Sequence, residues 1–166
     1  GLGSSGAFTV ALLAALHTHR REQVPTRELA EEAYLVETAR AGQPAGKHDH
    51  YLAAFGGLTC LEIDTSGQVQ VRALVLARHT LEELRNSLVL FYTGIQRESF
   101  DILAQQEHDT TRGDPQVVAS LHEVKRLGRQ IEEALSRGDL EHFGLLLDEH
   151  WQLKKRRSAR MSNPDI

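Results

Sequence analysis

The chain has 166 residues, of which 40% are hydrophobic and 25% are charged. This composition is ordinary for a soluble globular protein, and the length allows one domain with a real core or two small lobes. The formal net charge of −4 gives no overall basic field that would indicate a nucleic-acid partner. No apolar stretch approaches the roughly 20 residues of a membrane span. The single cysteine, Cys60, favours a reducing, cytoplasmic location.

Residues 1–8, Gly-Leu-Gly-Ser-Ser-Gly-Ala-Phe, form the most informative segment. Their glycines allow the backbone to approach a phosphate closely, and the apolar run over 7–20 predicts a helix whose N-terminus attracts anions. Ser4 and Ser5 add hydroxyls that can bind a phosphate oxygen or a magnesium ion. We interpret the segment as a cradle for a nucleotide phosphate. A flexible Gly/Ser-rich leader is the alternative.

The first half of the chain is predicted to contain three helices and a hairpin. The helices are expected over residues 7–20, 25–41 and 51–55, with Thr26 as the N-cap of the second. Residues 42–46 form a turn before the third helix. Two strands over 58–63 and 68–76, joined by a turn over 64–67, are predicted to pair as the hairpin.

The second half is predicted to be mostly helical. A continuous apolar run over 87–92 predicts a third strand that is buried on both faces, and a helix over 96–108 follows it. Asp114 and Pro115 are expected to begin a long amphipathic helix that Gly138 ends. Asp139 is the expected N-cap of a last helix that continues towards Arg160. This order of elements predicts the α+β class.

Asp49 is the second candidate functional residue. It lies in a predicted loop between His48 and His50, where a carboxylate can orient a sugar hydroxyl and accept its proton. Lys47 could lower the pKa of this carboxyl or stabilise developing negative charge. The alternatives are that Asp49 caps the helix that starts at His50, or that the His-Asp-His segment binds a metal, which its spacing does not favour.

Glu37 lies on the predicted second helix, twelve residues before Asp49. A helix carboxylate and a loop serine are hard oxygen ligands, which magnesium accepts together with phosphates and waters. An ordinary surface glutamate is the alternative.

Several segments in order resemble the GHMP small-molecule kinases. Residues 1–8 are similar to the phosphate-binding motif of that family, which runs into a helix. Residues 42–57, containing Gly46-Lys47-His48-Asp49-His50-Tyr51 and then Ala53-Ala54-Phe55-Gly56-Gly57, resemble the branch that phosphorylates D-glycero-D-manno-heptose 7-phosphate. Residues 88–103 and the late segments 150–155 and 162–164 also match that branch. His48 and His50 replace glutamines that are commoner there, and Gly6 replaces a serine or alanine.

The resemblance implies roles for individual residues. ATP phosphates would be bound by the backbone of Gly1, Leu2, Gly3, Ser4, Ser5, Gly6 and Ala7. Ser5 and Glu37 would bind Mg²⁺, and Asp49 would be the base or orienting carboxylate for the sugar hydroxyl. Lys47 would contact phosphate or substrate, and the substrate would be approached by Thr93, Gly94 and Arg97.

The resemblance also implies a fold with two lobes. Residues 1–78 would form the rest of an N-terminal lobe of the ribosomal-protein-S5-like type, and residues 79–166 part of a ferredoxin-like C-terminal lobe. The family has a longer N-terminal segment and a C-terminal glycine-rich motif that this sequence lacks, so we expect a central fragment of a longer kinase. Such a fragment alone is expected to be poorly stable or sticky and to lack activity.

The implied function is an ATP-dependent sugar kinase, a phosphotransferase with an alcohol acceptor. It would phosphorylate the anomeric hydroxyl of the heptose 7-phosphate for nucleotide-activated heptose and surface polysaccharide. A related kinase acting on fucose or galactose is the first alternative, and a non-catalytic remnant that binds a sugar or a protein is the second. The expected partners are Mg-ATP and a sugar phosphate, without nucleic acid or membrane, and a homodimer is compatible with the sequence.

Overall fold

The computed structural model describes residues 3–92, 94, 110–113 and 115–157. Contacts divide the chain into two compact units, Gly1–Ala73 and Leu74–Ile166. The described elements confirm a mostly helical α+β chain. No helix in these described ranges is long and apolar enough to cross a bilayer.

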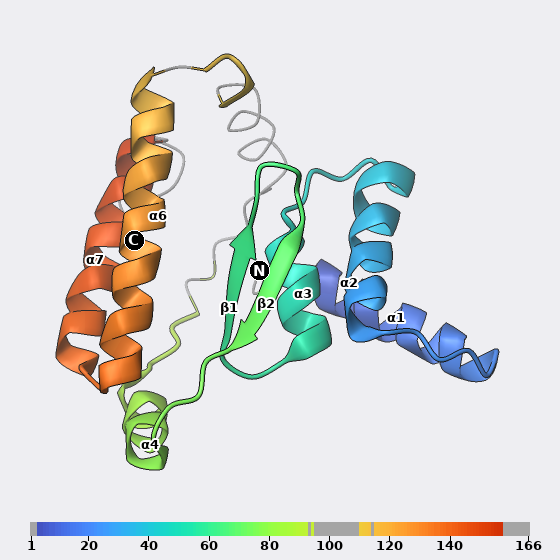
Figure 1. Ribbon diagram of the computed structural model, residues 1–166, viewed down its shortest axis with the longest axis horizontal. Helices are drawn as coiled ribbons and strands as arrows, with labels where there is room; N and C mark the ends of the chain where they lie inside the picture. Colours follow the sequence, from blue (N-terminus) through green and yellow to red (C-terminus); the bar gives the residue numbers. More distant parts are fainter. Residues whose placement is uncertain (1–2, 93, 95–109, 114, 158–166) are drawn as a thin grey trace. The chain divides into compact units, whose positions relative to one another are not determined.

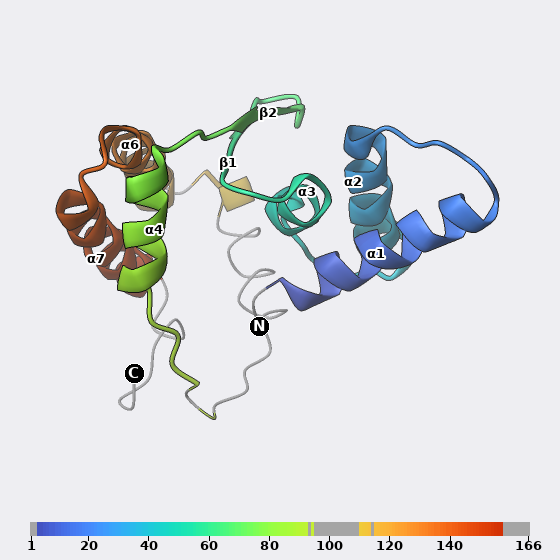
Figure 2. The same ribbon diagram turned by 90° about the horizontal axis from the view of Figure 1, so that it is seen from below.

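The first unit contains four helical segments and one hairpin (Figure 1). In chain order they are α1 (Ser4–His19), α2 (Thr26–Leu35), the π-helical turn η1 (Val36–Arg40), α3 (Lys47–Phe55), β1 (Thr59–Ile63) and β2 (Val69–Ala73). Helix α3 contacts α1, α2 and β1, and Figure 2 shows it between the hairpin and the other two helices. The third helix is therefore the centre of this unit.

The core of the first unit joins α2, α3 and β2. Ala30, Tyr51 and Val69 are fully or almost fully buried there, and the partly buried Leu61 and Val71 of the hairpin pack against them. These two hairpin residues are directly paired across the antiparallel strands, so they lie on the same face of the hairpin. The alternation of apolar and polar residues predicted this half-buried hairpin correctly.

The turn of the hairpin is closed by Asp64. Its Oδ1 accepts hydrogen bonds from the hydroxyl and backbone N–H of Ser66, at 2.7 and 2.8 Å, and from the N–H of Gln68 at 3.0 Å. The side-chain hydrogen bond from Ser66, followed by the backbone bond from Gln68, holds the pKa of Asp64 below its ordinary value. Gly67 has a φ of 80°, a conformation that glycine adopts without strain.

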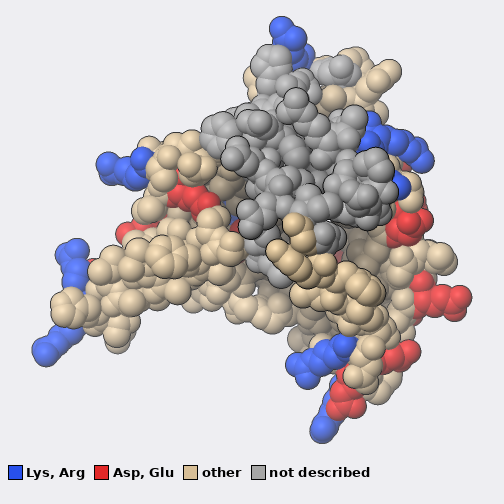
Figure 3. All heavy atoms as spheres, turned by 180° about the vertical axis from the view of Figure 1, so that it is seen from behind, with Lys and Arg blue, Asp and Glu red and all other residues tan. Residues whose placement is uncertain are grey.

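Helix α1 is apolar around most of its circumference. It contains no Lys, Arg, Asp or Glu, and Figure 3 accordingly shows the surface along it in tan, with blue only near its far end. Gly6 and Val10 are buried, whereas Phe8, Leu12 and Leu16 are exposed. The predicted helix over 7–20 is confirmed, but it begins at Ser4, inside the glycine-rich segment.

His17 joins the end of α1 to the segment that follows and to α2. Its Nδ1 lies 2.8 Å from Glu22 Oε2 and its Nε2 lies 2.7 Å from Glu32 Oε2. The hydrogen bond with Glu32, followed by that with Glu22, raises the pKa of His17 above 6.5. The imidazolium can donate to both carboxylates at once, because both of its ring nitrogens carry protons.

We expect His17→Gln to destabilise the protein in a pH-dependent way. Because the folded-state pKa is raised, the contribution of His17 is fully present below pH 6.5 and is lost as the pH rises through the raised value. The difference in thermal midpoint between wild type and variant should therefore shrink on the alkaline side. His19→Gln, at an exposed position of the same helix end, is the control, and an equal pH dependence in both variants would contradict the assignment.

The second unit contains α4 (Arg78–Ser87), α6 (Pro115–Arg137) and α7 (Leu140–Arg157). Leu127 and Ala134 of α6 pack against Leu146 of α7, with Ile131, Phe143 and Leu153 partly buried around them.

The short connection between α6 and α7 confirms two sequence predictions. Gly138 has a φ of 74°, and the Oδ1 of Asp139 accepts a hydrogen bond from the N–H of His142 at 3.0 Å, as an N-cap does.

The predicted third strand over 87–92 is wrong. Ser87 is the last residue of α4, a helix that the sequence analysis did not predict, and residues 88–92 have no regular secondary structure. Leu88, Leu90 and Tyr92 are 60%, 78% and 90% exposed. A strand needs neighbouring strands to satisfy its backbone, and the only sheet in the described residues is the β1–β2 hairpin.

The start of the second helix also differs from the prediction. Pro25, not Thr26, occupies the N-cap position of α2, because the fixed φ of proline suits the entry to a helix. The second helix ends in a wider turn, in which the N–H of Ala41 donates to the carbonyl of Val36 at 2.9 Å.

Three other sequence predictions lie outside the described residues. They are the helix over 96–108, the cap at Asp114 and the end of the last helix near Arg160.

Candidate functional site

The described part of the glycine-rich segment forms the beginning of α1. Gly1 and Leu2 lie outside the described residues, and Gly3 is the N-cap, with a φ of 68°. Ser4, Ser5 and Ala7 are exposed, whereas Gly6 is buried. A glycine N-cap has no side-chain oxygen for the first N–H groups of the helix, so these donors are left to another acceptor. This is the geometry in which a helix N-terminus binds an anion.

Asp49 lies directly against this helix N-terminus. A Cβ added to Gly3 would lie 3.0 Å from Asp49 Oδ1, and one added to Gly6 would lie 3.1 Å from Asp49 Cβ. A side chain at either position would therefore crowd Asp49, so the two glycines favour the close approach of α1 to α3. The structure thus brings together the predicted phosphate-binding segment and the predicted base, which are more than forty residues apart in the sequence.

The expected loop around Asp49 is instead helical. Helix α3 begins at Lys47, so Asp49 lies in its first turn, where an acidic side chain is favoured by the partial positive charge of the helix end. The predicted start at His50 or Tyr51 was too late, because Gly46 is the N-cap and the helical backbone begins at Lys47. Asp49 is 42% exposed, and its Oδ1 lies 3.4 Å from His48 Nε2.

Lys47 is engaged with the scaffold of the first unit. Its ammonium donates to Glu31 Oε1 at 2.8 Å and to the carbonyl of Gly67 at 2.7 Å, and it lies 5.3 Å from the centre of the Tyr34 ring. Tyr51 also donates to Glu31 Oε1, at 2.5 Å. Burial raises the pKa of Glu31, but the hydrogen bonds from Lys47 and Tyr51 outweigh it and leave the pKa below its ordinary value.

These contacts predict a mainly structural effect for Lys47→Met. Of its two hydrogen-bond donors, Glu31 would keep only the Tyr51 hydroxyl. We therefore expect the free energy of unfolding, measured in urea, to fall by about 1–3 kcal/mol. The loss should shrink as the pH falls below 4.5, because the folded-state pKa of Glu31 is lowered and its contribution disappears as it is protonated. The Michaelis constants should stay close to those of wild type.

Glu31→Gln is the matched variant for this prediction. Because Lys47 and Glu31 share one contact, the double variant should be less destabilised than the sum of the two single variants. A large fall in kcat with little loss of stability would instead show that Lys47 acts in the chemistry, as the sequence analysis predicted.

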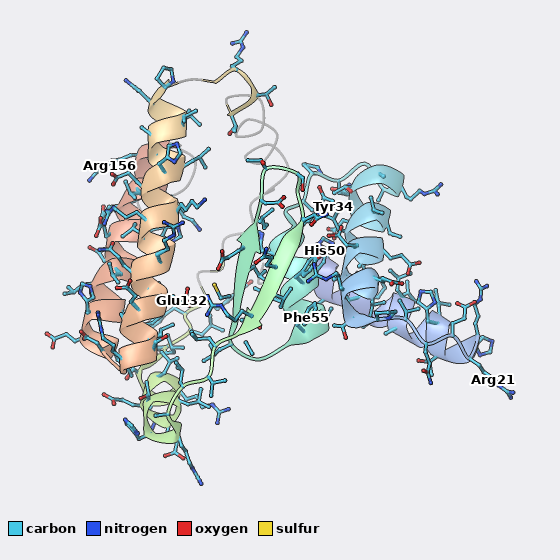
Figure 4. The ribbon with its side chains drawn as sticks, viewed as in Figure 1. Arg21, Tyr34, His50, Phe55, Glu132 and Arg156 are labelled. Atoms are coloured by element: carbon cyan, nitrogen blue, oxygen red, sulfur yellow. The ribbon has the colours of Figure 1, made fainter. Side chains whose placement is uncertain are left out.

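Glu37 lies in η1 and accepts a hydrogen bond from His50 of α3. His50 Nε2 is 2.6 Å from Glu37 Oε2, and the two side chains are 1% and 11% exposed. Figure 4 shows His50 beside Tyr34 of α2, whose ring meets the imidazole edge-on at a centroid distance of 5.8 Å. From the sequence, His50 was considered as a helix start, as part of a disfavoured metal-binding segment and as a departure from a family pattern, but not as a partner of Glu37. The spacing of 13 residues between Glu37 and His50 gives no sign of their contact.

The donor set around this site fits a magnesium–phosphate group. Ser5, Glu37 and Asp49 offer hard oxygen atoms, and α1 and η1 are in contact. Within the described ranges no three His, Cys, Asp or Glu side chains gather as a metal cluster. A cation here would therefore take few protein ligands and complete its coordination with phosphate and water oxygens, as Mg²⁺ commonly does.

The predicted substrate residues after 92 belong to the second unit of the chain. Thr93 and Arg97 lie outside the described residues. Gly94 is exposed, with a φ of 71°, and belongs to the second unit.

Comparison with known proteins supports the kinase resemblance. Residues 1–57 match the family described as the GHMP kinases N terminal domain. The chain is 30% identical over 167 residues to the D-glycero-alpha-D-manno-heptose 7-phosphate kinase of Campylobacter jejuni, covering 100% of this chain and 48% of that protein. It is 25% identical over 169 residues to the L-fucokinase/L-fucose-1-P guanylyltransferase of Bacteroides fragilis, covering 100% of this chain and 18% of that protein.

A solved structure of a heptose kinase is also similar to this chain. The crystal structure of a D-glycero-D-manno-heptose 1-phosphate kinase from Bacteroides thetaiotaomicron matches with a TM-score of 0.77 and 28% identity, over 94% of this chain and 44% of that one. The chain therefore belongs to the GHMP kinase family. It spans less than half the length of each of these relatives.

Proposed function

We propose that the full-length protein that contains this chain is an ATP-dependent sugar kinase acting on the anomeric hydroxyl of a heptose 7-phosphate. The observation that supports it best is the contact between the glycines of α1 and Asp49. This contact supports a phosphate site at the start of α1, beside a carboxylate that would accept a proton. The likeness to two heptose kinases, at 30% and 28% identity, supports the choice of sugar.

Residues of the first unit would have separate roles in phosphoryl transfer. The N–H groups at the start of α1, with Ser4, would hold ATP phosphates, and Ser5 with Glu37 would hold Mg²⁺. When bound, Mg-ATP supplies the phosphoryl group and offsets its negative charge. Asp49 would orient the sugar hydroxyl and accept its proton as the new O–P bond forms and the bond to ADP breaks. Positioning and charge account for most of the catalysis in such transfers.

The finer assignments of fold and pathway belong to the same proposal. Residues 1–78 would be part of the S5-like lobe, and residues 79–166 part of the ferredoxin-like lobe. The sugar 1-phosphate product would serve a reaction that forms nucleotide-activated heptose.

The test is ADP release from Mg-ATP by the full-length protein with different sugars. D-glycero-D-manno-heptose 7-phosphate is expected to give sugar-dependent release, and L-fucose and D-galactose much less. Release with fucose alone would keep the family and replace the substrate, an alternative supported by the 25% identity to the fucokinase. No release with any of these sugars would contradict the proposed activity.

A further inference from the structure

His50 is the most completely buried polar side chain near the candidate site. Its relative exposure is 0%, and its Nε2 makes the 2.6 Å contact with Glu37 Oε2. Its Nδ1 is also buried and has no hydrogen-bond partner among the described residues. Leaving a buried polar atom unpaired costs free energy. Core packing alone would be served better by an apolar side chain, so the position calls for another explanation.

The surroundings of His50 include three parts of the candidate site, which are Asp49, Gly6 and Glu37. Asp49 precedes it in α3, and its backbone N lies 3.4 Å from the position of a Cβ added to Gly6. Tyr34 limits the movement of the imidazole ring through its edge-on contact. The ring therefore has a defined direction, and that direction brings Nε2 to the Glu37 carboxylate.

We propose that His50 is a positioning residue for Glu37. The Nε2–H group donates to Oε2 of Glu37 and so fixes the rotation of the carboxylate, which leaves Oε1 for a divalent cation at the phosphate-binding segment. Groups that orient a metal ligand in this way commonly change metal affinity by about 10- to 100-fold when they are removed. The inference rests on the proposed function, because it assigns Glu37 to the cation of the nucleotide complex.

The test compares two amides at position 50. A glutamine amide can donate from about the position of Nε2, whereas the shorter asparagine amide reaches only about the position of Nδ1. Mn²⁺ replaces Mg²⁺ as the probe, and its binding to the full-length protein with a non-hydrolysable ATP analogue is followed by electron paramagnetic resonance. We expect His50→Asn to weaken Mn²⁺ binding by about tenfold or more, and His50→Gln to restore most of the affinity.

Three further measurements separate positioning from general damage to the fold. The thermal midpoints of both variants are recorded without ligand, and His79→Asn repeats the substitution at an exposed histidine. In a Glu37→Gln background, His50→Asn should weaken Mn²⁺ binding no further, because the residue through which His50 acts is already lost. A loss of Mn²⁺ affinity that only follows the loss of thermal stability would overturn the inference.

The remaining outcomes distinguish this inference from the proposed function. If wild type binds Mn²⁺ with the nucleotide analogue and His50→Asn binds it equally well, the inference fails and the kinase proposal stands. If His50→Asn weakens binding further in the Glu37→Gln background, His50 acts by another route and the inference fails. If wild type binds neither Mn²⁺ nor the analogue, the proposed function fails and the inference fails with it.

Discussion

Replacing Asp49 by asparagine is expected to lower kcat by about 10²- to 10⁴-fold, the range attributed to a general base. The substitution keeps the size of the side chain and removes its charge, so a change in activity reports proton transfer and orientation rather than packing. Asp49 is 42% exposed, and the atoms that meet the glycines of α1, which are Oδ1, Cγ and Cβ, have counterparts of the same size in asparagine. The thermal midpoint and the affinity for ATP should therefore stay close to those of wild type.

The measurement is steady-state ADP release by the full-length protein at saturating Mg-ATP and heptose 7-phosphate. Glu28→Gln, which makes the same change of carboxylate to amide at an exposed position of α2, is the control. Asp49→Glu adds a test of position, because it moves the carboxylate by about 1 Å, and such a displacement can cost about 10²-fold in rate. A fall of less than about tenfold in Asp49→Asn would show that Asp49 is not the base.

Local sequence patterns predicted most of the regular structure. The apolar run of α1, the alternating strands around the turn at Asp64, and the Gly138–Asp139 pair each depend on residues that are close in the chain. The same is true of the glycine-rich segment and the Lys47–Tyr51 segment, whose similarity to the GHMP kinases identified the family. The physical basis is the same in each case, since turns, caps and helix faces are determined within one or two turns of backbone.

The contacts that organise the site could not be predicted in this way. Glu37 and His50 are 13 residues apart, Glu31 and Lys47 are 16 apart, and Glu31 and Tyr51 are 20 apart. Several glutamates lie on α2 and η1, and several donors lie on α3. The pairs that form depend on how α2 and η1 pack against α3. The sequence therefore indicated Lys47 as a catalytic candidate, whereas the fold shows a lysine that joins α2 to the hairpin turn.

The wrong strand prediction has a related cause. Residues 88–92 have the apolar composition of a buried strand, but a strand forms only where a neighbouring strand accepts and donates its backbone hydrogen bonds. Composition describes the segment alone and contains no information about such a neighbour.

Tyr51→Ala is expected to have the largest effect on stability, about 3–5 kcal/mol. The side chain is fully buried between α2 and the hairpin, its ring is stacked on Phe55 at a centroid distance of 5.9 Å, and its hydroxyl holds Glu31. Removing it leaves a cavity and an incompletely paired carboxylate. Since whole domains are stable by only about 5–15 kcal/mol, the loss should be visible in urea unfolding and, by hydrogen exchange, mainly in residues 1–73.

Tyr51→Phe separates the ring from the hydroxyl. It keeps the core contacts and leaves Lys47 on Glu31, so it should cost only about 1 kcal/mol. Burial, followed by the hydrogen bond to Glu31, raises the pKa of Tyr51 to about 12, and the phenylalanine variant should remove this late step from the absorbance titration of the phenols. Equal losses of stability in Tyr51→Ala and Tyr51→Phe would mean that the hydrogen bond, and not the packed ring, holds α3 to the hairpin. The contacts predict a larger loss in Tyr51→Ala. The ring packs against Ala30 of α2 and Val69 of β2, whereas the hydroxyl donates to a single carboxylate that Lys47 also binds.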